Sequence, residues 1–258
     1  MPSRKSGRWT SPWPKARARA APAVKTVTRA GTRTAALGGF LAVGALDAWL
    51  AGHAETSAHR ARWLTKPALM PLLATALLNR RGIEDSPMRN STLLGEAAGW
   101  VGDVILLNDG TVAFAAGAGA FGVGHAAYIR GLRANRRIER PLKYAPSGRV
   151  AMALTLGVGP LMAVGAARED PALSPAVVAY MVLLATMFAH AGNLRTDLPP
   201  RARRLTSIGA AAFVASDSLL ATRQFWWRSA PTRVESMVMI SYLLAQLLLS
   251  EGAAAATR

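Results

Sequence analysis

The sequence predicts an all-α fold, a polytopic membrane bundle of eight transmembrane helices with both termini in the cytoplasm. The first observation is composition: 51% of the 258 residues are hydrophobic and only 17% are charged. The second is that the apolar residues form long runs separated by short arginine-rich stretches, as in polytopic membrane proteins. The third is a net charge of +17 that is unevenly distributed between the two ends of these runs. The chain has no cysteine, which excludes disulfides and thiolate metal sites.

Residues 1–34 are predicted to form a disordered basic tail in the cytoplasm. They contain nine basic residues, and the first acidic residue of the chain is Asp47. Pro12, Pro14 and Pro22 interrupt the stretch, and its high charge favours disorder. An acid-poor, arginine-rich start is also typical of a targeting peptide. We favour a tail that contacts anionic lipid headgroups.

Eight apolar segments follow the tail, each close to the ~17–25 residues that a helix needs to cross the hydrocarbon. Helices are expected because every backbone amide in the membrane must be satisfied internally. We place the eight-helix domain at residues 35–252 and a short C-terminal tail at 253–258. The segments cover residues 35–52, 64–78, 91–107, 111–130, 149–167, 174–191, 206–222 and 233–250.

Local features define several of these helices. The turn at residues 108–110 is so short that segments 91–107 and 111–130 must form an antiparallel hairpin. Pro71 and Pro160 fall inside apolar segments and are predicted to kink their helices. Glycine and alanine are frequent within the segments, as expected where helices pack closely in lipid.

The distribution of basic residues predicts the orientation. With the N-terminus inside, the cytoplasmic side carries 24 lysines and arginines and the opposite side carries six. Basic loops remain in the cytoplasm, so this asymmetry places both termini there. Tryptophans at the outer helix ends match an interfacial aromatic belt. They are Trp49, Trp63, Trp226 and Trp227.

Ionisable residues lie inside the apolar segments, where a charge costs about 2.5–3.5 kcal/mol on insertion scales. Counting ~1.5 Å per residue along each helix puts Asp47, Asp103 and Asp217 roughly 6–8 Å below the outer interface, with Lys66 at a similar depth. The glutamate and the histidine lie deeper, on facing sides of the hairpin. These residues are Asp47, Lys66, Glu96, Asp103, His125 and Asp217.

Several of these residues also have ordinary structural interpretations. Lys66 can extend to the outer headgroups, and Asp47 is near enough to the interface to be solvated there. His125 is more typical of a packing residue than of a metal ligand. For Asp103 and Asp217 we favour a functional role, because buried carboxylates persist mostly beside a cavity or a partner. We predict that Lys66, Asp103 and Asp217 line one polar cavity opening toward the outer leaflet.

Five motifs occur in order from Leu64 onward. They are TKPALMPLL (65–73), GWVGDVILL (99–107), FGVGHAAYI (121–129), GAAAFVASDSLLATRQF (209–225) and VMISYLLAQLLL (238–249). Together, on an eight-helix plan, they resemble the lysoplasmalogenase family, also called YhhN-like membrane proteins. The basic tail takes no part in the resemblance.

The resemblance implies an integral membrane hydrolase that cleaves the vinyl ether bond of lysoplasmalogens. The products would be a fatty aldehyde and a glycerophospho-base, such as glycerophosphocholine or glycerophosphoethanolamine. Asp103 and Asp217, the aspartates of the G-D and S-D motifs, are the implied catalytic residues, with no cofactor and no metal. The residues implied to bind the lysophospholipid are Lys66, His125, Tyr128, Ser216, Tyr242 and Gln246.

Two carboxyl groups suit this reaction. Vinyl ether hydrolysis needs an acid that protonates the enol-ether carbon and a carboxylate that stabilises the resulting oxocarbenium ion, much as in glycoside hydrolysis. Asp217 lies in a run of small apolar residues beside Ser216, which favours a neutral acid. We therefore assign Asp217 as proton donor and Asp103 as its ionised partner, and the reverse assignment stays open. Lys66 is a candidate for holding the substrate phosphate.

Two other functions match the same residues. A transporter or channel would also place carboxylates along its pathway, and a non-catalytic bundle would need only that its polar residues pair internally. Membrane topology explains the basic excess without nucleic acid. The expected partners are a lysophospholipid and the surrounding membrane lipid, in a bacterial plasma membrane.

Overall fold

The computed structural model describes residues 23–257, with side chains from residue 28 onward. This part of the chain is all-helical, and an isolated bridge between Arg136 and Leu194 is its β-type pairing. The elements are α1 (Ala23–Ala51), α2 (Thr56–Leu78), η1 (Ile83–Asp85), α3 (Arg89–Ile105), α4 (Thr111–Ala134), η2 (Leu142–Tyr144), α5 (Pro146–Glu169), α6 (Leu173–Ala191), α7 (Pro200–Phe225) and α8 (Arg233–Ala254). Each predicted apolar segment overlaps one of the α-helices.

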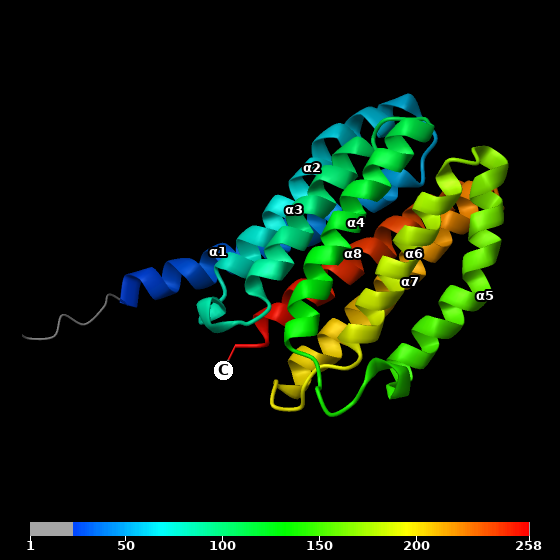
Figure 1. Ribbon diagram of the computed structural model, residues 1–258. Helices are drawn as coiled ribbons and strands as arrows, with labels where there is room; N and C mark the ends of the chain where they lie inside the picture. Colours follow the sequence, from blue (N-terminus) through cyan, green and yellow to red (C-terminus); the bar gives the residue numbers. More distant parts are fainter. Residues whose placement is uncertain (1–22, 258) are drawn as a thin grey trace, which may run out of the picture.

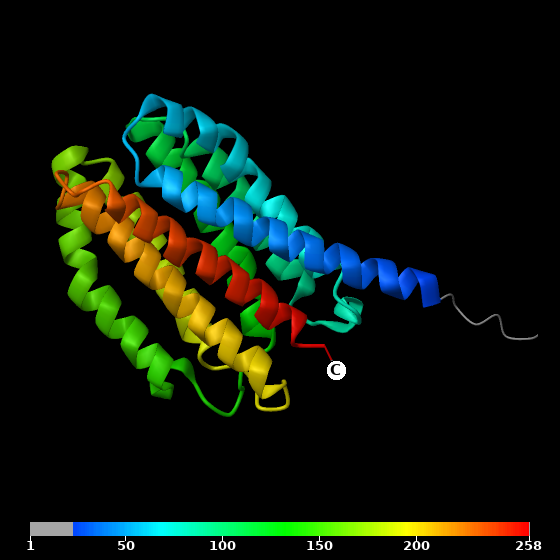
Figure 2. The ribbon, with the colours of Figure 1, turned by 180° about the vertical axis from the view of Figure 1, so that it is seen from behind.

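The helices lie side by side in one elongated bundle (Figure 1). Helices adjacent in sequence form four packed pairs: α1 with α2, α3 with α4, α5 with α6, and α7 with α8. Helix α8 also contacts α1, α2 and α3 and is the most buried of the candidate spans. Helix α5 lies at one edge, while α1 projects beyond its neighbours at its N-terminal end (Figure 2).

Helix α1 begins earlier than predicted, at Ala23. Residues 23–34 are therefore helical, which corrects the predicted disorder of this part of the tail, and residues 1–22 lie outside the described residues. A long-range ion pair explains the extension, because Arg33 is half-buried against Glu251 of α8. A contact so distant in sequence is invisible to composition alone.

Two other helix ends differ from the prediction. Helix α2 begins at Thr56 instead of residue 64, because its polar first turns pack against α1, where Arg62 pairs with Asp47. Helix α8 continues to Ala254, so the predicted C-terminal tail begins later than residue 253. Its final alanines are buried against neighbouring helices, which stabilises the extra turn.

In the part of the chain that the structure describes, six helices are long and apolar enough to cross a membrane: α1 over Thr28–Ala51, and α4 through α8. The chain is therefore an integral membrane protein. Helix α2 carries Arg60, Arg62 and Lys66, and α3 is 17 residues long with two carboxyl groups inside it. Arg62, Lys66 and Asp103 form ion pairs inside the bundle, as described below, whereas Glu96 makes none within residues 28–257 and Arg60 is exposed. Crossing by all eight helices stays a prediction.

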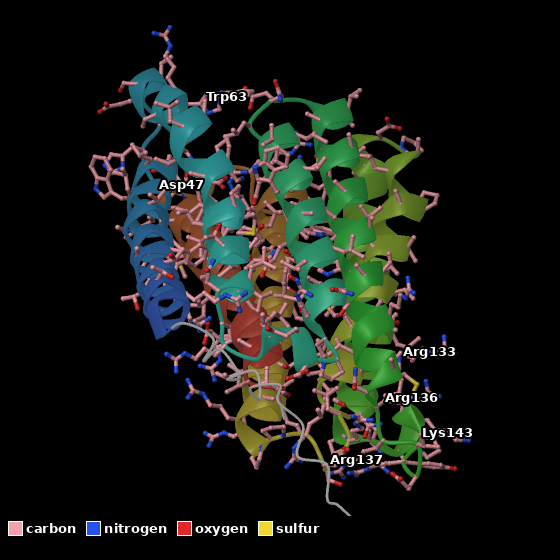
Figure 3. All side chains as sticks on the ribbon, turned by 90° about the vertical axis from the view of Figure 1, so that its left-hand side faces the viewer. Asp47, Trp63, Arg133, Arg136, Arg137 and Lys143 are labelled. Carbon is pink, nitrogen blue, oxygen red and sulfur yellow. The ribbon has the colours of Figure 1, made fainter. Side chains whose placement is uncertain are left out.

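The two ends of the bundle differ in chemistry. Asp47 and Trp63 lie toward one end, and Arg133, Arg136 and Lys143 lie at the other (Figure 3). The tryptophan side chains predicted to form the outer belt are exposed. This polarity agrees with an orientation in which the arginine-rich end faces the cytoplasm.

Single-cysteine labelling tests that orientation, since the chain has no cysteine of its own. Asp109 lies in the α3–α4 turn at the tryptophan end, and Glu139 lies in the loop after α4; both are exposed. Asp109→Cys should react with a membrane-impermeant maleimide on intact cells, whereas Glu139→Cys should react only after permeabilisation. Labelling of Glu139→Cys from outside would overturn the predicted topology.

Glycines allow α7 and α8 to approach closely. A Cβ on Gly209 would lie 2.9 Å from the Leu249 backbone nitrogen, and one on Gly252 would lie 2.9 Å from the Thr206 backbone nitrogen. Backbone atoms cannot move aside as a side chain can, so any larger residue must separate the helices.

Gly209→Ala should therefore lower the free energy of unfolding by about 1–3 kcal/mol, the usual cost of overpacking. Gly119→Ala is the matched control, because a Cβ added at Gly119 would meet nothing within 4 Å. This control should be neutral or slightly stabilising, since alanine favours helix over glycine. Denaturant titration in mixed micelles measures both, and equal stability of the two variants would contradict the close packing.

Candidate functional site

Asp103 of α3 lies at the centre of a buried polar group that joins α2, α3 and α8. Its Oδ1 is 3.4 Å from the Lys66 ammonium of α2. Its Oδ2 accepts a 2.7 Å hydrogen bond from the Tyr242 hydroxyl of α8. The Asp103 and Lys66 side chains are 2% and 8% exposed, so Lys66 pairs inside the bundle instead of extending to the headgroups.

The group continues along α8 to α4. The Gln246 amide donates to the Tyr242 hydroxyl at 3.3 Å, and the Tyr128 hydroxyl donates to the Gln246 carbonyl oxygen at 2.8 Å. Tyr242 and Gln246 are four residues apart and therefore share one face of α8. On α3, Gly99 is four residues before Asp103 and leaves room for the Gln246 amide, which would lie 3.1 Å from a Cβ there.

Asp47 of α1 extends the same charged region toward the tryptophan end. It is fully buried and accepts a 2.7 Å hydrogen bond from the Thr65 hydroxyl. Arg62 lies 3.3 Å from the same carboxylate. The interpretation of Asp47 as solvated at the interface is therefore wrong. Arg62 and Thr65 precede Lys66 by about one turn or less, so α2 presents three polar side chains to α1 and α3.

Asp217 of α7 anchors a second polar group. Its Oδ2 accepts a 2.5 Å hydrogen bond from the Tyr180 hydroxyl of α6. His125 Nε2 lies 3.0 Å from that hydroxyl and 3.7 Å from the Asp217 oxygen. Sequence reasoning does not single out Tyr180; its one signal is that it is the sole tyrosine of the apolar segment 174–191.

An aromatic layer separates the two groups. The Phe213 ring is 4.7 Å from the His125 ring and 5.7 Å from the Tyr242 ring, measured between centroids, and stands edge-on to both. The structure thus brings Lys66 and Asp103 together, as predicted, but places Asp217 across Phe213 with different partners. Shared depth along the helix axes did not make the two carboxyl groups direct neighbours.

A model of the YhhN family matches residues 61–253 of the chain. That is most of its length. The chain belongs to the YhhN family. Comparison with curated proteins and with solved structures found no match.

The matched region of this YhhN-family protein holds both polar groups, and Asp47 lies before it. Ser216, predicted to contact substrate, is buried and donates to the Val238 carbonyl of α8 at 3.0 Å. This bond ties α7 to α8 one residue before Asp217. Its predicted substrate contact stays a prediction.

Glu96 is a third buried carboxyl group of the YhhN-family bundle. It is 1% exposed, and neither oxygen makes a hydrogen bond within the described residues. Ser250 of α8 and Tyr128 of α4 lie close enough to Glu96 to interact with its carboxyl group, but the Ser250 hydroxyl does not form a hydrogen bond with it.

Metal ligands are not grouped in this part of the YhhN-family protein. Within residues 28–257, no three histidine, aspartate or glutamate side chains lie close enough together to hold an ion. The groups with chemical capacity are the two hydrogen-bonded aspartates and the cations and hydroxyls that contact them.

Proposed function

We propose that this YhhN-family protein is a membrane hydrolase that cleaves the vinyl ether bond of lysoplasmalogens. The observation that carries the proposal is the pair of hydrogen-bonded aspartates, Asp103 and Asp217, flanking one aromatic ring within the region matched by the family. The products would be a fatty aldehyde and a glycerophospho-base. We place the protein in the plasma membrane of a bacterium.

The reaction begins with transfer of a proton to the enol-ether carbon, which converts the vinyl ether into an oxocarbenium ion. Water then adds to the cation, and the hemiacetal collapses to aldehyde and alcohol. The protein must supply one proton donor and one negative charge near the cation. Two carboxyl groups in different surroundings can divide these tasks.

Asp103 fits the role of the ionised partner, because the Lys66 ammonium 3.4 Å away compensates a negative charge there. The sequence analysis made Asp217 the neutral acid because its surroundings looked more apolar. That reason is wrong, because the Asp217 side chain is 13% exposed and the Asp103 side chain only 2%. We retain Asp217 as proton donor for a different reason. Its partners are a phenol and an imidazole, Tyr180 and His125, which can return a proton to it after turnover.

Aromatic rings support the same arrangement. The vinyl ether would lie against Phe213, with its developing cation near the faces of Phe121 and Tyr242, whose centroids are 5.6 Å apart. Aromatic faces stabilise cations in water-poor sites. Arg62, toward the tryptophan end, would attract the substrate phosphate, and Lys66, about one turn deeper in the bundle, would add its positive charge.

Aldehyde release tests the proposal directly. Purified protein in mixed micelles should convert a lysoplasmalogen to fatty aldehyde, captured as a hydrazone, in equal amount to the glycerophospho-base. The matched control is the lysolipid with a saturated alkyl ether, which cannot be protonated to an oxocarbenium ion and should remain intact. A lysoplasmalogen left intact by the folded protein would refute the hydrolase and favour a transporter or a structural role.

A further inference from the structure

The arginine-rich end of the bundle is hollowed by two adjoining grooves. One, of about 510 Å³, is lined by the end of α4, including Ala126, Ile129 and Arg130. The other, of about 390 Å³, is lined by the loop after α4 and by His190 of α6. Arg133 and Arg136 line both, and we call the two together the basic groove.

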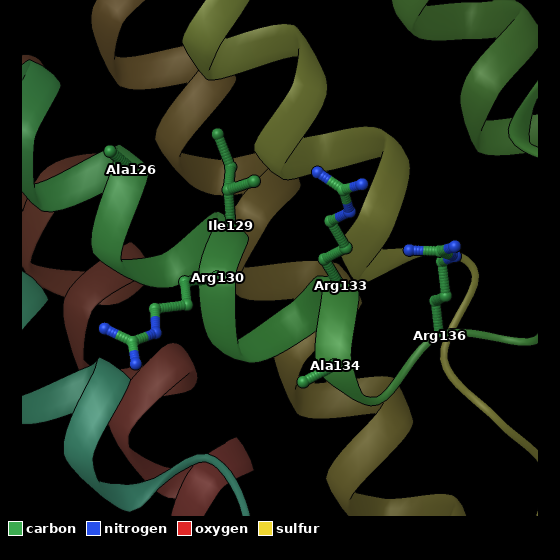
Figure 4. A pocket seen from close by; sticks show the side chains of 6 residues that line it. All are labelled: Ala126, Ile129, Arg130, Arg133, Ala134 and Arg136. Atoms are coloured by element: carbon green, nitrogen blue, oxygen red, sulfur yellow. The ribbon is translucent and has the colours of Figure 1, made fainter.

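The positive charge of the basic groove is uncompensated. None of its arginines, at positions 130, 133, 136, 137 and 140, makes an ion pair with an acidic side chain in residues 28–257. Arg133, in the last turn of α4, and Arg136, just after the helix, extend in the same direction, while Arg130 points away from them (Figure 4). Positive charges on neighbouring side chains repel each other, and an anion bound between them would relieve that repulsion.

The loop that carries these arginines is held in place. The Arg137 amide donates to the Asn193 carbonyl, and the Arg195 amide donates to the Asn135 carbonyl, both at 2.9 Å. The Asn193 side chain donates to the Arg140 carbonyl at 2.9 Å. The arginines are therefore presented by a fixed backbone, so that little entropy is lost when an anion binds.

A buried imidazole also lines the basic groove. His190 is 6% exposed, and its Nδ1 has no hydrogen-bond partner among the described residues. It interacts electrostatically with Arg133 and Arg136. Buried polar atoms in proteins nearly always have a hydrogen-bond partner, and a ligand bound in the groove would supply one for His190 Nδ1.

We propose that the basic groove binds the headgroup of an anionic phospholipid. The phosphate would lie between Arg133 and Arg136, and an acyl chain would follow Ala126 and Ile129 along α4 into the hydrocarbon. This apolar continuation favours a lipid over a soluble phosphate compound. Ile138, at 84% exposed, adds an apolar side chain beside the arginines at the level of the interface. Basic pockets between helix ends are a known form of lipid recognition.

Native mass spectrometry of the detergent-solubilised full chain tests the proposal, with phosphatidylglycerol and phosphatidylcholine of identical acyl chains as probes. The wild type should retain phosphatidylglycerol preferentially. Arg133→Gln/Arg136→Gln should bind it roughly 30-fold more weakly, because each basic residue near an anionic lipid contributes about 1 kcal/mol. The control is Arg201→Gln/Arg204→Gln on α7, which removes the same charge from exposed positions at the same end and should bind within about threefold of the wild type.

Three results would overturn the proposal: equal loss of phosphatidylglycerol in both double variants, equal retention of the two lipids by the wild type, and displacement of phosphatidylglycerol by equimolar inorganic phosphate. Equal loss in both double variants would indicate that the lipid responds to the overall positive charge of this end and not to the basic groove. Displacement by phosphate would indicate a soluble phosphate ligand. Thermal unfolding confirms that each variant is folded. The inference does not depend on the hydrolase activity, because the basic groove lies at the opposite end from Asp47 and Trp63 (Figure 3).

Discussion

Asp103→Asn and Asp217→Asn are each expected to reduce aldehyde release from lysoplasmalogen by ~10²–10⁴-fold, the usual cost of removing a general acid or its charged partner. Asparagine preserves the shape of the side chain and its hydrogen-bonded neighbours but can neither donate the proton nor carry the charge. Initial rates of aldehyde formation at saturating lipid measure the effect. Asp109→Asn, in the exposed α3–α4 turn, is the matched control and should keep the wild-type rate.

The Asp217 variant is the cleaner of the two tests. Its partners are neutral or weakly basic, whereas Asp103→Asn leaves the Lys66 ammonium buried without a counterion. Thermal unfolding of both variants separates a loss of chemistry from a loss of fold. Near-normal turnover by either folded variant would remove that residue from the mechanism, and near-normal turnover by both would make the two carboxyl groups structural.

Lys66→Met is expected to lower the free energy of unfolding by about 3–5 kcal/mol, because it strands the Asp103 carboxylate inside the bundle. Arg223→Met is the matched control, because it breaks the ion pair between Arg223 and Glu235. The Arg223 side chain is 36% exposed and the Glu235 side chain 24% exposed. Exposed pairs contribute about 0–1 kcal/mol, so this variant should differ little from the wild type. Denaturant titration in mixed micelles measures both.

A second substitution distinguishes a stranded charge from lost packing. Lys66→Met/Asp103→Leu removes both charges, so it should recover part of the stability lost in Lys66→Met. If Lys66→Met/Asp103→Leu is instead less stable than Lys66→Met, by as much as a separate core substitution would cost, then Lys66 and Asp103 do not stabilise each other. The proposed ion pair at 3.4 Å would then be wrong.

Hydropathy alone was enough to predict the helices, because burial in lipid requires long apolar runs with internally satisfied backbones. The hairpin of α3 and α4 followed from the short turn at 108–110, and the difference between the two ends followed from the arginines. Helix ends were predicted less well. The start of α1 depends on Arg33 meeting Glu251, which no local pattern encodes.

The candidate site, too, could be predicted from the sequence only in part. The sequence by itself determined which polar residues lie at similar depth, because position along a helix sets depth, and Lys66 and Asp103 do meet. Only the tertiary structure decided how each helix is rotated about its axis. That rotation buried Asp47 against Arg62, joined Tyr180 to Asp217, and placed Phe213 between the two groups. Rotation is set by side-chain packing between helices distant in the chain, where close fits such as Gly209 against Leu249 leave one arrangement free of clashes.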